Sequence, residues 1–215
     1  MLVLIRGAGD LASGVALRLR RCRFAVVMTD LLQPTAIRRT VCFSQALRFG
    51  STTVEDVTAV RCQTPQDVQS ALDAGQIPVL ADPEASCKSW LRPDVLVDGI
   101  LAKKNLGTTI NDAPLVIALG PGFCAGRDCH AVVETMRGHT LGRVIWDGEP
   151  IPNTNIPGLI GGFAGERVLR APDTGMFHQL LDIGALVEAG QAAGEVNGKP
   201  MLCTISGVLR GILPD

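Results

Sequence analysis

The feature that most constrains this chain is a glycine-rich turn between a short apolar run and an amphipathic segment. Residues 2–5 (LVLI) are apolar, Gly7-Ala8-Gly9 turns the chain, and apolar residues then recur at helical spacing as far as Cys22. A second apolar run over 24–29 ends at Asp30. This order predicts a β-α-β unit, which crosses over right-handed into a parallel sheet.

The alternation of strands and helices continues downstream. Thr64-Pro65 is a typical helix start, and Gly75 a typical end. Short buried strands are predicted over 77–80, 95–97 and 115–119. We therefore expect an α/β fold with a Rossmann-like parallel sheet over residues 1–150.

The last third of the chain differs in character. Prolines and the pair Gly161-Gly162 predict an irregular connection over 151–165. Beyond it, short apolar pieces alternate with glycines, and Asn197-Gly198 is a strong hairpin signal. Four such pieces are expected as strands, at 168–169, 186–187, 201–205 and 208–209. Residues 166–215 are predicted to form a small all-β unit of barrel-sandwich type.

Composition excludes several classes of protein. The net charge of −1 argues against a nucleic-acid partner, because phosphate backbones require a basic surface. The first apolar run is too short for a signal peptide or a membrane span, and no other stretch approaches spanning length. The seven cysteines include no C-x-x-C pair, which favours free thiols in the cytoplasm over disulfides or a zinc site. We expect a cytoplasmic protein with no membrane partner and no metal.

The segment GAGDLA fits the G-x-G-x-x-G/A fingerprint of dinucleotide-binding turns. Gly7 would make the turn, Gly9 would admit a pyrophosphate, and Ala12 would allow close helix packing. Asp30, 21 positions after Gly9, would bond ribose hydroxyls. Asp10 would repel a diphosphate unless it caps the helix, as aspartate at a helix start usually does. A purely architectural turn is the alternative.

Two further loops follow predicted strands and could contact a ligand. Gly120-Pro121-Gly122 comes directly after the apolar run 115–119. In a parallel sheet this end of a strand is where ligands bind. Lys103 and Asn105 follow the strand predicted over 95–97, and this lysine-containing loop could either hold a second anion or provide surface charge only.

The densest polar cluster lies between residues 124 and 139. His130 and Glu134 would share one face of a helix or a strand, and could act as a general base with its orienting group or as two ligands of one metal. Asp128 and Cys129 are the other candidate catalytic residues. The alternative is a solvated polar surface.

Several long blocks of the chain resemble the YqeB-like family, the accessory proteins of selenium-dependent molybdenum hydroxylases. The blocks lie at 6–19 (RGAGDLASGVALRL), 26–41, 95–108, 113–146 and 167–177. The glycine turn also resembles that of xanthine dehydrogenase accessory proteins, which carry a Rossmann-type domain.

The resemblance implies a part in maturing or inserting the molybdenum cofactor, with a molybdenum hydroxylase as the client protein. It implies that Gly7, Gly9 and Asp30 bind a nucleotide or a pterin phosphate. It also implies that Cys124 or Cys129 could carry transferable sulfur or selenium.

Three functions therefore remain open. The chain could be an accessory protein that binds NAD(P), an ATP- or CTP-type nucleotide or the molybdopterin cofactor. It could be an NAD(P)-dependent oxidoreductase, although a chain without tyrosine has no Tyr-x-x-x-Lys pair. It could also be a non-catalytic chaperone or scaffold. The sequence leaves open whether any reaction is catalysed, and a homo-oligomer is compatible with each alternative.

Overall fold

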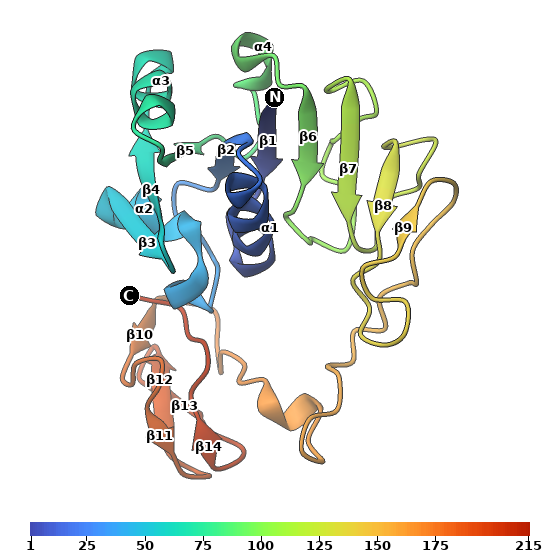
Figure 1. Ribbon diagram of the computed structural model, residues 1–215. Coiled ribbons are helices and arrows are strands. Elements are labelled where there is room, and N and C mark those ends of the chain that lie inside the picture. The colour runs from blue at the N-terminus through green and yellow to red at the C-terminus, as the bar shows by residue number, and fades with distance from the viewer. The chain divides into compact units, whose positions relative to one another are not determined.

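The computed structural model describes residues 1–215, which fall into two compact units (Figure 1). The first comprises residues 1–34 and 41–153, and the second comprises 35–40 and 154–215. The sequence suggested contiguous domains with a connection over 151–165. The assignment of residues 35–40 to the second unit was not foreseen.

The first unit is an α/β structure built on one large, mostly parallel sheet. Its strands are β1 (Leu2–Arg6), β2 (Ala25–Asp30), β3 (Ser51–Val54), β4 (Val57–Cys62), β5 (Ile77–Ala81), β6 (Val95–Asp98), β7 (Leu115–Leu119), β8 (Ala131–Val133) and β9 (Val144–Ile145). Their order is β3-β4-β5-β2-β1-β6-β7-β8-β9, and only the edge pairs β3/β4 and β8/β9 are antiparallel. The strands β2 to β5 therefore lie on one side of β1, and β6 to β9 lie on its other side.

Few helices accompany this sheet, and two of them cover opposite faces. They are α1 (Asp10–Arg21), α2 (Ala46–Phe49), α3 (Pro65–Asp73) and α4 (Lys88–Leu91). Ala16 of α1 packs with Val3 and Ile5, whereas Val68 of α3 packs with the alternate residue Leu4. Each face of β1 is therefore apolar, as a strand in the middle of a covered parallel sheet requires.

The predicted β-α-β start and the helix after Thr64 are confirmed. Thr64 and Asp67 form a reciprocal capping box at the start of α3. The hairpin β3/β4 was not predicted. No helix of the chain is long and apolar enough to cross a membrane.

The carboxyl ends of β1 and β6 approach each other as closely as glycine allows. Gly7 has a φ of +103°, and a Cβ placed on it would lie 3.0 Å from the backbone of Gly99 and Ile100. A Cβ on Gly99 would in turn lie 3.0 Å from Cβ of Ala12. The glycine turn can therefore pack against the loop after β6 only because its residues at these positions are small.

The second unit consists of two small antiparallel sheets. One contains β10 (Phe177–Gln179), β12 (Ala192–Val196) and β13 (Lys199–Leu202), and the other contains β11 (Leu186–Val187) and β14 (Gly207–Val208). The hairpin predicted at Asn197-Gly198 is confirmed, with both residues at positive φ. The strand predicted at 168–169 is wrong, because those residues follow a 3₁₀ turn over Gly165–Arg167 as irregular backbone.

Arg39 and the backbone of Ile37 tie residues 35–40 to the second unit, where the N–H of Ile212 donates to the carbonyl of Ile37 at 2.9 Å. Arg39 donates from Nε to the carbonyl of Ile212 at 2.9 Å. Its Nη2 also donates to Gln179 Oε1 and to Asp182 Oδ1, at 3.1 and 3.0 Å. These contacts anchor the segment to the end of the chain.

We expect Gly7→Ala to destabilise the first unit by about 2–5 kcal/mol, because it combines an unfavourable φ with a backbone clash. Gly14→Ala is the matched control. Gly14 lies on the exposed side of α1 with open space around it, and we expect about 0.5–1 kcal/mol of stabilisation. Urea unfolding of both variants measures the difference. Equal stabilities would contradict the close approach of β1 and β6.

Candidate functional site

Loops from neighbouring strands converge at the carboxyl edge of the sheet. Gly7 packs against the loop after β6, as described above. A Cβ on Gly122, after β7, would lie only 2.5 Å from Cα of Lys104. A Cβ on Gly120 would meet Thr135 Oγ1 at 2.5 Å. The structure thus brings together the glycine turn, the lysine-containing loop and the GPG turn that the sequence indicated.

The glycine turn is held by the end of β2. The backbone N–H of Gly7 donates to the carbonyl of Thr29 at 2.8 Å. The N–H of Ala8 donates to Asp30 Oδ2, also at 2.8 Å, while Oδ1 accepts the N–H of Leu31 at 2.7 Å. Burial raises the pKa of Asp30, although the two backbone hydrogen bonds favour its charged form. Asp30 is therefore a structural partner of the turn before any ligand binds.

The first turn of α1 is uncapped. Its N-cap is Gly9, so no side chain caps the helix, and the N–H groups of Leu11 and Ala12 have no partner in the protein. The expectation that Asp10 caps the helix is wrong: Asp10 is the first helical residue, an acid in the first turn. The helix therefore presents backbone donors beside the glycine turn.

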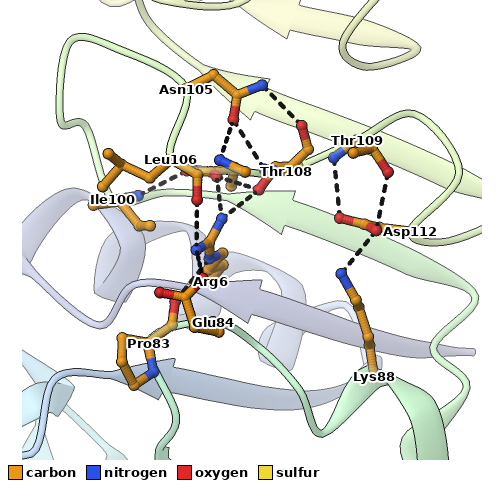
Figure 2. Close-up of polar contacts among 12 residues, drawn as sticks. Arg6, Pro83, Glu84, Lys88, Ile100, Asn105, Leu106, Thr108, Thr109 and Asp112 are labelled. Atoms are coloured by element: carbon orange, nitrogen blue, oxygen red, sulfur yellow. Dashed lines mark hydrogen bonds and ion pairs between the residues drawn. The ribbon is translucent and has the colours of Figure 1, made fainter.

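A buried arginine organises the neighbouring loops (Figure 2). Arg6, the last residue of β1, is only 4% exposed. Its Nε donates to the carbonyl of Pro83, after β5. Its Nη1 and Nη2 donate to Thr108 Oγ1 and the carbonyl of Leu106, after β6. All three bonds measure 2.9 Å, so one side chain joins the ends of three strands.

Two carboxylates compensate the charge of Arg6. Asp98 lies opposite Arg6 in the β1/β6 register, and its Oδ2 is 3.8 Å from Nη1. The Thr108 hydroxyl donates to the same Asp98 oxygen at 2.6 Å. Burial raises the pKa of Asp98, although Thr108, the N–H of Ile100 and Arg6 all favour its charged form. The exposed carboxylate of Glu84 lies 3.4 Å from Nη2.

The side chain of Asn105 closes the loop after β6 on itself. Its Oδ1 accepts the N–H groups of Gly107 and Thr108, and its Nδ2 donates to the carbonyl of Thr108 (Figure 2). At the far end of the loop, Lys88 of α4 donates to Asp112 at 2.8 Å. The amide of Asn105, a predicted cofactor contact, is thus engaged by its own loop.

The structure does not bring His130 and Glu134 together. His130 precedes β8, and its Nδ1 accepts the N–H of Val116 near the start of β7. Glu134 follows β8 and is 2% exposed, with its two oxygens accepting the N–H groups of Met136 and Ile151. The full length of β8 separates the two side chains, so an acid–base pair made of them is not formed.

Asp128 and Cys129 lie in the loop that returns from β7 to β8. Asp128 accepts the N–H of Cys124 at 2.8 Å, and its hydrogen bonds from Arg127 hold the pKa of Asp128 below its usual value. Burial, with a smaller effect from the charge of Asp128, raises the pKa of Cys129 to about 11. A thiol with this pKa carries almost no thiolate at neutral pH. No group of three or more His, Cys, Asp or Glu side chains is arranged to hold a metal ion.

Sequence reasoning missed Arg6 and Thr108. The sequence does contain a signal for Arg6: it ends an apolar strand directly before a glycine turn, where a side chain is expected to be buried. Thr108 carries no comparable local signal.

The comparisons with known proteins give one match. Over 214 residues the chain is 47% identical to a protein of Escherichia coli strain K12 named "Uncharacterized protein YqeB". The chain is similar to YqeB. The match covers 100% of this chain and 40% of YqeB, and it supports the relation to YqeB-like proteins expected from the sequence blocks. No family model and no solved structure matches the chain.

We expect Arg6→Gln to destabilise the first unit by about 3–5 kcal/mol, because it leaves Asp98 buried without its cation. Arg21→Gln is the control, since Arg21 pairs with Glu55 and Asp56 at the protein surface. Its loss should leave the urea midpoint essentially unchanged. Equal effects of the two variants would contradict the organising role of Arg6.

We also expect Cys129 to resist alkylation by iodoacetamide in the folded protein at pH 7, because its raised pKa leaves little thiolate. The exposed Cys22 should react readily under the same conditions. Peptide mass spectrometry after a timed reaction distinguishes the two thiols, and unfolding in urea should equalise them. Fast modification of Cys129 in the folded chain would restore it as a sulfur-carrier candidate.

Proposed function

We propose that the first unit binds a nucleotide-type cofactor by its phosphates at the glycine turn, as an accessory protein in maturation or insertion of the molybdenum cofactor of molybdenum hydroxylases. The observation that carries the binding proposal is the uncapped start of α1. Unpartnered N–H groups and the positive end of the helix dipole favour an anion there.

The strand order supports this position. The series β5-β2-β1-β6-β7-β8 has the order 3-2-1-4-5-6 of Rossmann-type folds, with the hairpin β3/β4 added at one edge. In such sheets ligands bind beyond the carboxyl ends of the strands, where the order reverses. Here the reversal lies between β1 and β6, beside the glycine turn.

Gly9 supports the same site by a different argument. Its φ is −69°, which any residue adopts, and a Cβ placed on it would meet nothing within 4 Å. The fold itself therefore does not require glycine at this position. A phosphate that approaches the backbone closely supplies a reason for it.

The acids near the turn limit the kind of ligand. Asp30 retains lone pairs that could accept sugar hydroxyls after its bonds to Ala8 and Leu31. Asp10 is a competing negative charge in the first turn, so the phosphate should approach on the side of Gly9.

The molybdenum part of the proposal rests on the similarity to YqeB and on the family resemblance, with the molybdopterin cofactor as one candidate ligand. The candidate acids and bases are already hydrogen-bonded to the backbone, which favours a binding function over a catalytic one. Glu134, Asp128 and His130 each hold backbone N–H groups of the fold. A cofactor-binding chaperone therefore suits the site better than an NAD(P)-dependent oxidoreductase, which is the second candidate because it would use the same turn.

We expect one ligand among NAD⁺, NADP⁺, ATP, CTP and the molybdopterin cofactor to raise the thermal midpoint. At 100 times its dissociation constant it should stabilise the fold by about 2.7 kcal/mol. Gly9→Ala should abolish this shift while changing the stability of the ligand-free protein by no more than about 1 kcal/mol. Gly14→Ala, five residues further along the chain, should keep the shift. Absence of any shift, or an equal shift in Gly9→Ala, would contradict the proposed site.

A further inference from the structure

The loop Leu101–Leu106, here called the dilysine loop, carries donors that the fold does not use. None of its six backbone N–H groups has a partner in the protein. Lys103 and Lys104 are exposed, and neither forms an ion pair. The loop therefore combines backbone N–H groups that lack a partner in the protein with two exposed cations.

The dilysine loop is fixed rather than free. Leu101 and Lys103 adopt left-handed φ values of +59° and +64°, which are unfavourable for residues with a side chain and persist only where the surroundings impose them. Arg6 holds the carbonyl of Leu106, and the Asn105 amide ties the next residues. Gly122 packs directly on the backbone of Lys104. The donors are thus arranged before any ligand binds.

The charge around the loop favours an anion. Asp98, the buried acid at the end of β6, is paired with Arg6, and the exposed Glu84 is partly held by the same guanidinium. Successive N–H groups in a backbone that includes left-handed residues can form a concave cradle for oxyanions. Lysine side chains strengthen such a cradle by charge-assisted hydrogen bonds.

We propose that the dilysine loop is a second anion-binding subsite that takes an oxyanion group, a phosphate or a carboxylate, of a ligand lying along the carboxyl edge of the sheet. The loop follows β6, the strand next to β1, and Ile100 packs against Gly7 of the glycine turn. With the glycine turn occupied as proposed above, the ligand carries anionic groups at two separate places. The subsite itself does not depend on the first site.

The test is a titration of the uniformly ¹⁵N-labelled chain with inorganic phosphate at constant ionic strength, followed by amide chemical shifts. The amides of 101–106 report the dilysine loop, and those of Gly9, Leu11 and Ala12 report the glycine turn. We expect saturable shifts in 101–106. A parallel titration with acetate shows whether a carboxylate is bound as well as a phosphate.

The double variant Lys103→Gln/Lys104→Gln should weaken phosphate binding at 101–106 about tenfold or more and leave the shifts at Gly9, Leu11 and Ala12 unchanged. Arg18→Gln, which removes an exposed cation near the other end of α1, is the control and should change neither set. The subsite is overturned if 101–106 do not respond, or respond equally in the double variant. Shifts confined to the glycine turn would overturn the subsite alone, and shifts confined to 101–106 would count against the glycine-turn site alone.

Discussion

The burial of one guanidinium at the end of β1 determines how the candidate site is built. A charge that is 4% exposed must be paired and fully hydrogen-bonded, because an unpaired buried ion costs several kcal/mol. Arg6 meets this requirement with Asp98, Thr108 and two carbonyls, so the chain after β5 and after β6 must close over it. This closure contributes to the fixed shape of the dilysine loop, together with Asn105 and the packing of Gly122 on Lys104.

In this arrangement the acidic side chains near the candidate site stabilise the fold and are not left available for catalysis. At the carboxyl edge of the sheet the acids that would serve catalysis are used by the fold: Asp98 by Arg6, Asp30 by the glycine turn and Glu134 by two backbone amides. The groups left over are backbone N–H donors and the exposed lysines Lys103 and Lys104, which are suited to contacts with anions. This use of the acids supports the proposal that the edge binds an anionic ligand and does not convert it.

The sequence predicted the parts of the fold that depend on local periodicity. The β1-α1-β2 unit, α3 and the hairpin at Asn197 are signalled within short windows of residues. The hairpin β3/β4 was missed because STTV has a single apolar residue. The prediction that His130 and Glu134 act as a pair was wrong. Their spacing predicts only that they share a face, but β8 lies between them and holds the two side chains apart. Arg6 was missed because its partners lie 77 to 102 positions away in the chain.

The segment 35–40 links the candidate site to the second unit through the chain itself. The units join at 34–35, 40–41 and 153–154. On one side of the excursion, Asp30 accepts the N–H of Ala8; on the other, Ser44 donates its N–H to the carbonyl of Ala8 at 3.0 Å. The joins at 34–35 and 40–41 therefore lie a few residues from Asp30 and Ser44, which both form hydrogen bonds with Ala8 of the glycine turn. Because Arg39 bonds to Ile212, the chain that leaves Asp30 and returns to Ser44 passes through a segment anchored in the second unit.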